Sequence, residues 1–468
     1  MQITSKNISK NMQFLLENIS KNMHNLIMLE RKAFNFLENW KNTKQNECLL
    51  IKGARQIGKT FIVREFAKNH YENFIEINFE KNPEMKAAFD SSLDVENLIK
   101  EITVRIPRIK FVPNKTLLFL DEIQVYPHLL TMLKFLNQDR RYRYIASGSQ
   151  LGIALAKTTS VPLGSIEIQQ MYPIDFEEFL GAMGVGKDAI QAMRQSFLER
   201  QSLPQDTHDY IMKLFRYYLL VGGLPDAVNK FVESRNMVVV RTIQRDVHEL
   251  YGIDASQYDA ENSLKIRRIY DLVPSNLENK KKRVRVKDIE NKKGKQFSDY
   301  ADEFEYLMHS GISLGVSAIS NPRFPLIESS VKDLLKLYLN DVGILTHILY
   351  GLNVNAILND EKSINLGTVY ESVVAQELRA HGFSKLYYYD NKQRGEVDFL
   401  IDDYNRLSVV PIEVKSGKDY TIHSALSHFI SNSEYNICEG VVFSNVREIS
   451  RKGKIIYLPI YYVMFIDN

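Results

Sequence analysis

A glycine-rich segment that ends in a lysine and a threonine carries the clearest chemical signal in the sequence. Residues 53–60 read Gly-Ala-Arg-Gln-Ile-Gly-Lys-Thr, which satisfies the spacing G-x-x-x-x-G-K-[ST] in full. Glycines at these positions let backbone N–H groups converge on phosphates, while the lysine supplies positive charge and the hydroxyl can ligate Mg²⁺. The segment predicts an ATP site in which Lys59 has a catalytic role. The binding residues expected here are Gly53, Ala54, Arg55, Gln56, Ile57, Gly58, Lys59, Thr60 and Phe61.

An apolar run that ends in two acids supplies the second half of such a site. Asp121 and Glu122 follow four apolar residues about sixty positions after the glycine-rich segment. We expect Asp121 to share a Mg²⁺ ion with Thr60, and Glu122 to orient or deprotonate the attacking water. Ser149 follows the next apolar run and either contacts the γ-phosphate or is an ordinary turn residue. Arg55 either contacts a phosphate or a neighbouring subunit, or is solvated.

Short apolar runs alternate with helical stretches around these residues, which is typical of a mostly parallel α/β sheet covered on both faces. The expected strands are Cys48–Lys52, Phe74–Phe79, Thr116–Leu120 and Tyr142–Ala146. The predicted fold class is α/β: a P-loop NTPase parallel sheet with a helical lid, a winged-helix-like connector and a C-terminal mixed α/β endonuclease-like domain. The expected boundaries are an N-terminal leader (1–29), the P-loop core (30–185), the lid (186–240), the connector (241–330) and the C-terminal domain (331–468).

Three acids and a lysine near the C-terminus form a second candidate site. Glu371 interrupts an apolar helical run, Asp398 lies in an apolar strand, and Glu413 and Lys415 end the next strand. Since side chains two apart on a strand share a face, Glu413 and Lys415 point the same way. We expect Asp398 and Glu413 to ligate a hard divalent ion, and Lys415 to activate water or steady a phosphodiester. The alternative is a structural domain whose acids have no catalytic role.

The order of several motifs resembles one prokaryotic group of AAA-like P-loop ATPases, whose C-terminal half is a domain of unknown function related to restriction endonucleases. The segments that carry the resemblance are Gly53–Thr60, Leu117–Gln124, Ser147–Ser149, Met171–Phe179 and Gly222–Val228. The resemblance implies ATP and Mg²⁺ as cofactors and a PD-(D/E)XK core, in which Glu371 matches the helix acid and would be a metal ligand. The chain departs from many relatives at Ser165, where they carry an arginine.

A basic stretch lies between the two candidate sites. Residues 280–297 contain nine Lys or Arg and two acids, a net charge of +7, whereas the whole chain has +3. Such a stretch can bind the phosphate backbone of DNA or RNA through Lys280–Lys295, although a solvated loop is the alternative. The helix expected to follow it is acidic, so base-specific reading is not expected. A protein partner is also considered.

Composition narrows the remaining choices. The 468 residues are 44% hydrophobic and 25% charged, which is typical of globular domains, and two cysteines cannot build a disulfide framework. No apolar run approaches the ~20 residues that a membrane span requires. These features predict a cytoplasmic protein with no membrane partner. Three hypotheses follow: an ATP-hydrolysing switch coupled to an endonuclease-like module, a nucleotide-gated binding protein, and a metal-dependent nuclease licensed by ATP.

Overall fold

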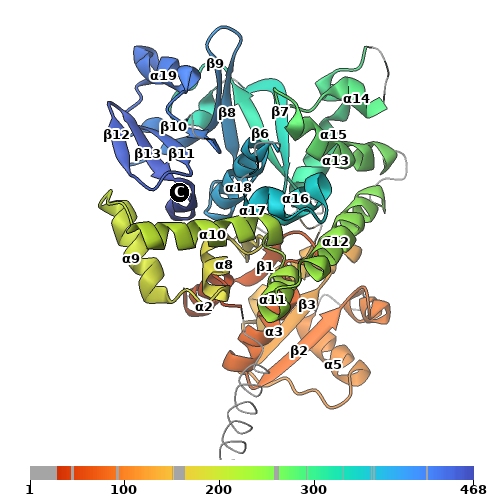
Figure 1. The fold of residues 1–468 in the computed structure, drawn as a ribbon. Helices are drawn as coiled ribbons and strands as arrows, with labels where there is room; N and C mark the ends of the chain where they lie inside the picture. The colour runs from red at the N-terminus through yellow and green to blue at the C-terminus, as the bar shows by residue number, and fades with distance from the viewer. Residues whose placement is uncertain are drawn as a thin grey trace, which may run out of the picture.

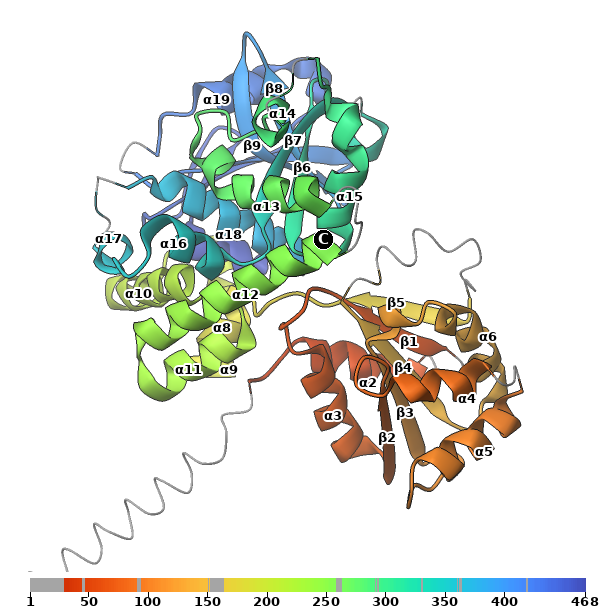
Figure 2. The ribbon, with the colours of Figure 1, turned by 90° about the vertical axis from the view of Figure 1, so that its right-hand side faces the viewer.

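The computed structural model describes residues 29–43, 47–90, 94–149, 151, 164–257, 263–290, 292, 294–329, 331–359, 361, 364–417 and 420–468. The leader expected over 1–29 lies outside these residues, apart from Leu29. The described residues form two lobes, each built around one sheet (Figure 2). None of the helices in this part of the chain is long and apolar enough to cross a bilayer.

The N-terminal lobe contains a five-stranded sheet in the order β2-β3-β4-β1-β5, with every neighbouring pair parallel. All six residues of β3 are buried, because helices cover both faces. The parallel sheet predicted from the apolar runs is confirmed; the edge strand β5 was missed because its sequence is largely polar. The elements are α2 (Ala33–Thr43), β1 (Cys48–Lys52), α3 (Lys59–His70), β2 (Asn73–Asn78), α4 (Lys86–Asp90), α5 (Val95–Arg105), β3 (Thr116–Asp121), α6 (Leu129–Asp139), β4 (Arg143–Gly148) and β5 (Ile166–Gln170).

Helices follow the first sheet, as the spacing of apolar residues predicts. The first of them begins with a capping box, in which Asp175 accepts a hydrogen bond from the Glu178 N–H and the Glu178 carboxylate accepts one from the Asp175 N–H. These helices lie against the C-terminal lobe (Figure 2). They are α8 (Phe176–Ala182), α9 (Lys187–Leu198), α10 (Gln205–Val221), α11 (Pro225–Ser234) and α12 (Met237–Gln257).

The expected connector continues into the C-terminal sheet. Its strand β6 (Ser313–Ile319) is antiparallel to β7 (Val331–Leu339) and parallel to β8. The boundary expected at residue 330 therefore falls between two paired strands of one sheet. Its helices, α13 (Ser263–Glu278), α14 (Val286–Glu290) and α15 (Ala301–His309), lie at one side of that sheet (Figure 1).

The C-terminal sheet has eight strands in the order β12-β13-β11-β10-β9-β8-β6-β7. Neighbours β8, β9 and β10 are antiparallel, and β10 is parallel to β11, so the sheet is mixed, as predicted. Helix α18 is almost completely buried between this sheet and the preceding helices. The remaining elements are α16 (Val342–Tyr350), α17 (Asn355–Leu358), α18 (Leu366–Ala380), β8 (Leu386–Asn391), β9 (Gly395–Asp403), β10 (Ser408–Val414), α19 (Ser424–Ser431), β11 (Gly440–Ser444), β12 (Ser450–Lys452) and β13 (Ile455–Pro459).

Candidate functional site

The glycine-rich segment forms a tight loop between β1 and the first turn of α3. Gly53 is required there because a Cβ at this position would lie 2.4 Å from the carbonyl oxygen of Met171. Gly58 caps α3 in the left-handed region, with φ of 92°. The loop therefore places backbone N–H groups at a helix N-terminus, where anions are favoured.

The Lys59 ammonium is held inside this loop. Its Nζ donates to the carbonyl oxygens of Gly53 at 2.9 Å and Ala54 at 2.7 Å. Burial lowers the pKa of Lys59 to about 8, although the charges of Glu122 and Asp121 act in the opposite direction. A bound phosphate group would raise this pKa again, because an adjacent negative charge favours the ammonium.

Asp121 ends β3 with its carboxylate fully hydrogen-bonded. Oδ2 accepts from Thr60 Oγ1 at 2.9 Å and from Asn78 Nδ2 at 3.1 Å, and Oδ1 accepts from the Ser147 hydroxyl. The structure thus brings together Thr60 and Asp121, which are sixty-one residues apart. Sequence reasoning missed Asn78, and it named Ser147 only as part of a motif, without its bond to Asp121; both lie at the carboxyl ends of strands that flank β3.

Glu122 follows directly, in the left-handed region with φ of 54°. This conformation is uncommon for a residue with a side chain and clusters at functional sites. Gln124 Nε2 donates to Glu122 Oε2 at 2.6 Å and to Ser149 Oγ at 3.4 Å. Gln124, which the sequence analysis did not single out, therefore links Glu122, the predicted water-activating residue, to Ser149, a candidate contact of the γ-phosphate.

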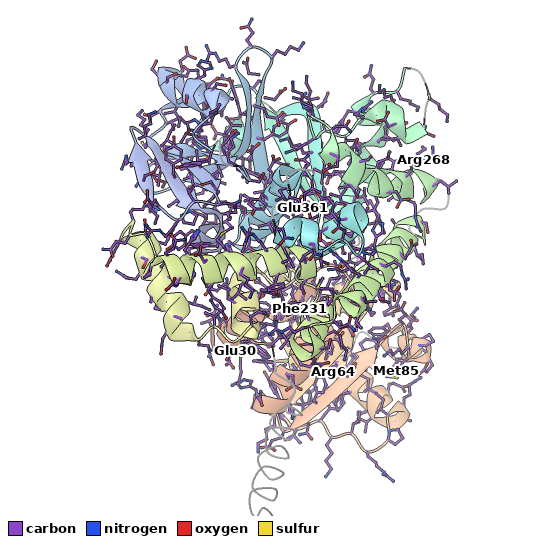
Figure 3. The ribbon with its side chains drawn as sticks, in the orientation of Figure 1. Glu30, Arg64, Met85, Phe231, Arg268 and Glu361 are labelled. Atoms are coloured by element: carbon purple, nitrogen blue, oxygen red, sulfur yellow. The ribbon has the colours of Figure 1, made fainter. Side chains whose placement is uncertain are left out.

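A cavity of about 860 Å³ opens over the loop. This volume lies in the range of small-molecule sites. Lys59, Thr60 and Glu122 line one part of it, and Pro225 and Asn229 of α11 line another. Figure 3 labels Arg64 on α3 and Phe231 on α11; both helices contribute residues to the lining of the cavity.

Two arginines, one before the loop and one within it, connect it to the rest of the molecule. Arg31, which sequence reasoning missed, donates to the carbonyl oxygens of Ile57 at 3.0 Å and Tyr172 at 2.7 Å, and pairs with Glu178 at 3.1 Å. Arg55 lines the cavity, but its guanidinium pairs with Asp254 of α12 at 2.8 Å. In this structure the Arg55 guanidinium therefore binds the helical region. Ala54 and Ile57 are buried in the loop, whereas Phe61 is half exposed on the cavity wall.

The C-terminal acids lie near one another on α18, β9 and β10. Burial, together with the charges of Glu371 and Glu413, raises the pKa of Asp398 well above its usual value. Asp398 Oδ2 accepts from the Val414 N–H at 2.8 Å, and Lys415 Nζ pairs with Glu413 Oε1 at 2.7 Å. Within the described ranges, no three or more His, Cys, Asp or Glu are arranged to hold a metal ion. The four predicted residues are thus neighbours, and lysines take up part of their charge.

Comparison with known families divides the chain into three parts. Residues 45–180 match the family described as AAA domain. Residues 212–356 match a domain of unknown function (DUF8612), and residues 366–463 match another (DUF4143). A search of curated proteins found no match to the chain.

Three solved structures show a weak likeness. The Walker-type ATPase PABY2304 of Pyrococcus abyssi is 14% identical with a TM-score of 0.38, covering 71% of this chain and 96% of that chain. Cdc6p from Pyrobaculum aerophilum is 13% identical with a TM-score of 0.23, covering 73% and 94%. The RuvB Holliday junction branch migration motor of Thermotoga maritima is 16% identical with a TM-score of 0.26, covering 68% and 91%. At these scores the AAA match to residues 45–180 remains the informative comparison for the nucleotide site.

Proposed function

We propose that this protein binds ATP with Mg²⁺ at the glycine-rich loop and hydrolyses it. The observation that carries the proposal is the hydrogen bond between Thr60 and Asp121, directly beside the Lys59 ammonium. Their hydroxyl and carboxylate oxygens are the hard donors that Mg²⁺ prefers, so the residues fit the ion. When bound, Mg²⁺ neutralises charge on the phosphates.

Different residues of the chain would bind the phosphates and activate the attacking water. Backbone N–H groups of the loop bind phosphate oxygens, and Lys59 transfers its hydrogen bonds from the carbonyls of Gly53 and Ala54 to the phosphates. Glu122 lines the cavity and orients the attacking water or takes its proton. Gln124 holds the Glu122 carboxylate and connects it to Ser149, which favours the sensing role for Ser149 over that of a simple turn residue.

The test is ATP turnover by the wild-type protein, Lys59→Ala and Lys110→Ala. Lys110 is an exposed lysine that does not line the cavity, so its substitution is a matched control. We expect Lys59→Ala to lose roughly 100-fold or more in turnover, because it removes charge aimed at the transition state. Lys110→Ala should match the wild type. Equal rates in all three proteins would overturn the proposal.

A second candidate function is a divalent-cation site in the C-terminal domain, as in an endonuclease-like module coupled to the ATPase. One observation favours it: Glu413 is 6% exposed, and its Oε2 has no hydrogen-bond partner. A buried carboxylate oxygen without a partner is costly and indicates capacity for a ligand. The order α18-β8-β9-β10-α19-β11 also agrees with the resemblance.

Contact with nucleic acid would use the exposed part of the basic stretch. Lys282 and Arg283 face the C-terminal acids, so they contribute less to such a surface. The exposed basic side chains that remain are Lys280, Lys281, Arg285, Lys287, Lys292 and Lys295. Stimulation of ATP turnover by DNA or RNA, with a steep loss at higher salt, would support this role. Tight ATP binding without turnover would instead favour the nucleotide-gated binding protein.

A further inference from the structure

One basic residue of the connector lies inside the C-terminal carboxylate cluster, defined here as Glu371, Asp398 and Glu413. Lys282 Nζ forms a close ion pair with Glu371 Oε1, and the two side chains are 16% and 6% exposed. Burial alone would raise the pKa of Glu371, but the charges of Lys282 and Lys336 lower it. A cation supplied from another part of the chain therefore already stabilises the charged form of Glu371.

The backbone that delivers Lys282 is under strain. Lys282 lies in the left-handed region with φ of 46°, closing a turn in which its N–H donates to the Asn279 carbonyl oxygen at 3.0 Å. A residue with a side chain pays on the order of 1 kcal/mol or more for this conformation. The turn directly follows α13, on which Figure 3 labels Arg268. Strain of this kind persists only where surrounding contacts hold the segment in place.

The contacts of this segment lie at the edge strand and further into the sheet. The Val284 N–H donates to the Leu335 carbonyl oxygen of the edge strand β7 at 2.9 Å, and Arg283 pairs with Asp390 of β8 and with Glu396 of β9. Lys336 differs, since its side chain is fully buried on β7 and pairs with Glu396 at 2.6 Å. Lys336 is part of the sheet, whereas Lys282 reaches the cluster from the turn that follows α13.

The cluster also contains a carboxylate oxygen that neither Lys282 nor any other hydrogen-bond donor in the described residues contacts. Glu413 Oε2 is buried without a hydrogen-bond partner, while Lys415 binds only the other oxygen. Two or three carboxylates around one position suit a divalent cation better than an ammonium. In this structure the described acids are not arranged to hold such an ion.

We propose that Lys282 is a tethered cation that competes with a divalent metal ion for the carboxylate cluster. The metal site is closed while residues 280–284 lie against β7, and it opens when this segment withdraws. The inference rests on the second candidate function above, and it adds what regulates that site. It also assigns different roles to neighbouring lysines, because Lys281 is exposed and reaches no carboxylate of the cluster.

The test is Mn²⁺ binding to the full-length protein without nucleotide, followed by electron paramagnetic resonance. Lys282→Met keeps the apolar stem and removes the charge, and Lys281→Met is the matched control. We expect Lys282→Met to bind Mn²⁺ at least tenfold more tightly than the wild type, and Lys281→Met to match the wild type. Adding Glu371→Gln to Lys282→Met should abolish the gain.

Val284→Pro provides a second route that leaves every charge unchanged. It removes the N–H that anchors the segment to Leu335, so it should also tighten Mn²⁺ binding, even if Lys282→Met fails to fold. Equal Mn²⁺ affinity in the wild type, Lys282→Met and Val284→Pro would overturn the competition by Lys282, but it would leave the metal site itself standing. Folded variants that bind no Mn²⁺ at all would overturn both.

Discussion

The two candidate sites use the same residue types in opposite ways. At the nucleotide site, neutral donors hold the Asp121 carboxylate, and Lys59 bonds only to backbone carbonyls. In the C-terminal cluster, lysines pair directly with the carboxylates of Glu371 and Glu413. The first site keeps its charges available for a ligand, whereas the second satisfies much of its charge from within the chain. The difference indicates that ligand entry at the second site requires a rearrangement.

Glu122→Gln gives the sharpest test of the first half of this comparison. It retains the shape of the side chain and removes the base, so ATP turnover should fall about 10²- to 10⁴-fold. Nucleotide affinity should stay within a few-fold of the wild type, because phosphate binding uses the loop. Turnover is measured by phosphate release and affinity by calorimetry. Unchanged turnover in a protein that still binds ATP would remove Glu122 from the catalytic role.

Lys336→Met tests the second half of the comparison, that the C-terminal cluster depends on cations of the chain itself. Lys336 is fully buried, pairs with Glu396, and its charge also favours the charged forms of the buried Glu371 and Asp398, so removing it should lower the free energy of unfolding by about 3–5 kcal/mol. Lys281→Met should change it by less than ~0.5 kcal/mol. Urea unfolding measures both variants. A loss as small as that of Lys281→Met would show that the cluster does not depend on its internal cations.

A buried carboxylate outside both candidate sites gives a pH-dependent test. It is Glu377 on α18, which contacts Phe176 of α8 and Tyr218 of α10. Burial and the charge of Asp175 raise its pKa from 4.5 to about 7, although His381 and Lys32 act in the opposite direction. Between these two values the folded protein binds more protons than the unfolded chain, so this group lowers stability as pH rises from about 4.5 to 7.

Glu377→Gln should remove that dependence. The Gln carbonyl can still accept from the Phe176 N–H and the Tyr218 hydroxyl, as Glu377 Oε1 does. We expect the variant to be more stable than the wild type at pH 8, by on the order of 2 kcal/mol, and to gain nothing at pH 4.5. Urea unfolding at both pH values decides this. A variant that is equally destabilised at both would mean that the charge of Glu377 is not the cause.

Gln124→Ala should have the smallest effect of the four. Loss of the hydrogen bond to Glu122 leaves the carboxylate in place but poorly oriented, so turnover should fall about tenfold, equivalent to ~1.4 kcal/mol. Ser149→Ala should lower it in the same direction, since Ser149 is the other partner of Gln124. Phosphate release in both variants is the measurement. An unchanged rate in both would contradict a sensing role for Ser149.

The approach of the glycine-rich loop to Asp121 could be predicted because its main signal is local. Gly53–Thr60 are contiguous, and Asp121 and Glu122 end an apolar run that is itself recognisable. Asn78 and the bond from Ser147 to Asp121 were missed because their position beside Asp121 depends on β2 and β4 flanking β3. A polar residue at the carboxyl end of a neighbouring strand was the available signal.

For the C-terminal half, the sequence predicted the mixed α/β architecture but not the contacts between its side chains. The acids at strand ends indicate Asp398 and Glu413, yet nothing in the local pattern places Lys282 beside Glu371, eighty-nine residues away. The boundary expected at residue 330 depends on the same kind of distant contact. The sequence predicts a strand over 312–319, but only the pairing of β6 with β8 assigns it to the C-terminal sheet.

The central claim is that the loop between β1 and α3 binds the phosphates of ATP together with Mg²⁺. A crystal structure with a non-hydrolysable ATP analogue and Mg²⁺ tests it most directly. We expect the phosphates in the loop, the Lys59 ammonium moved from the carbonyls of Gly53 and Ala54 to the phosphates, and Mg²⁺ between Thr60 and Asp121. A nucleotide bound elsewhere, with Lys59 still on those carbonyls, would contradict the account.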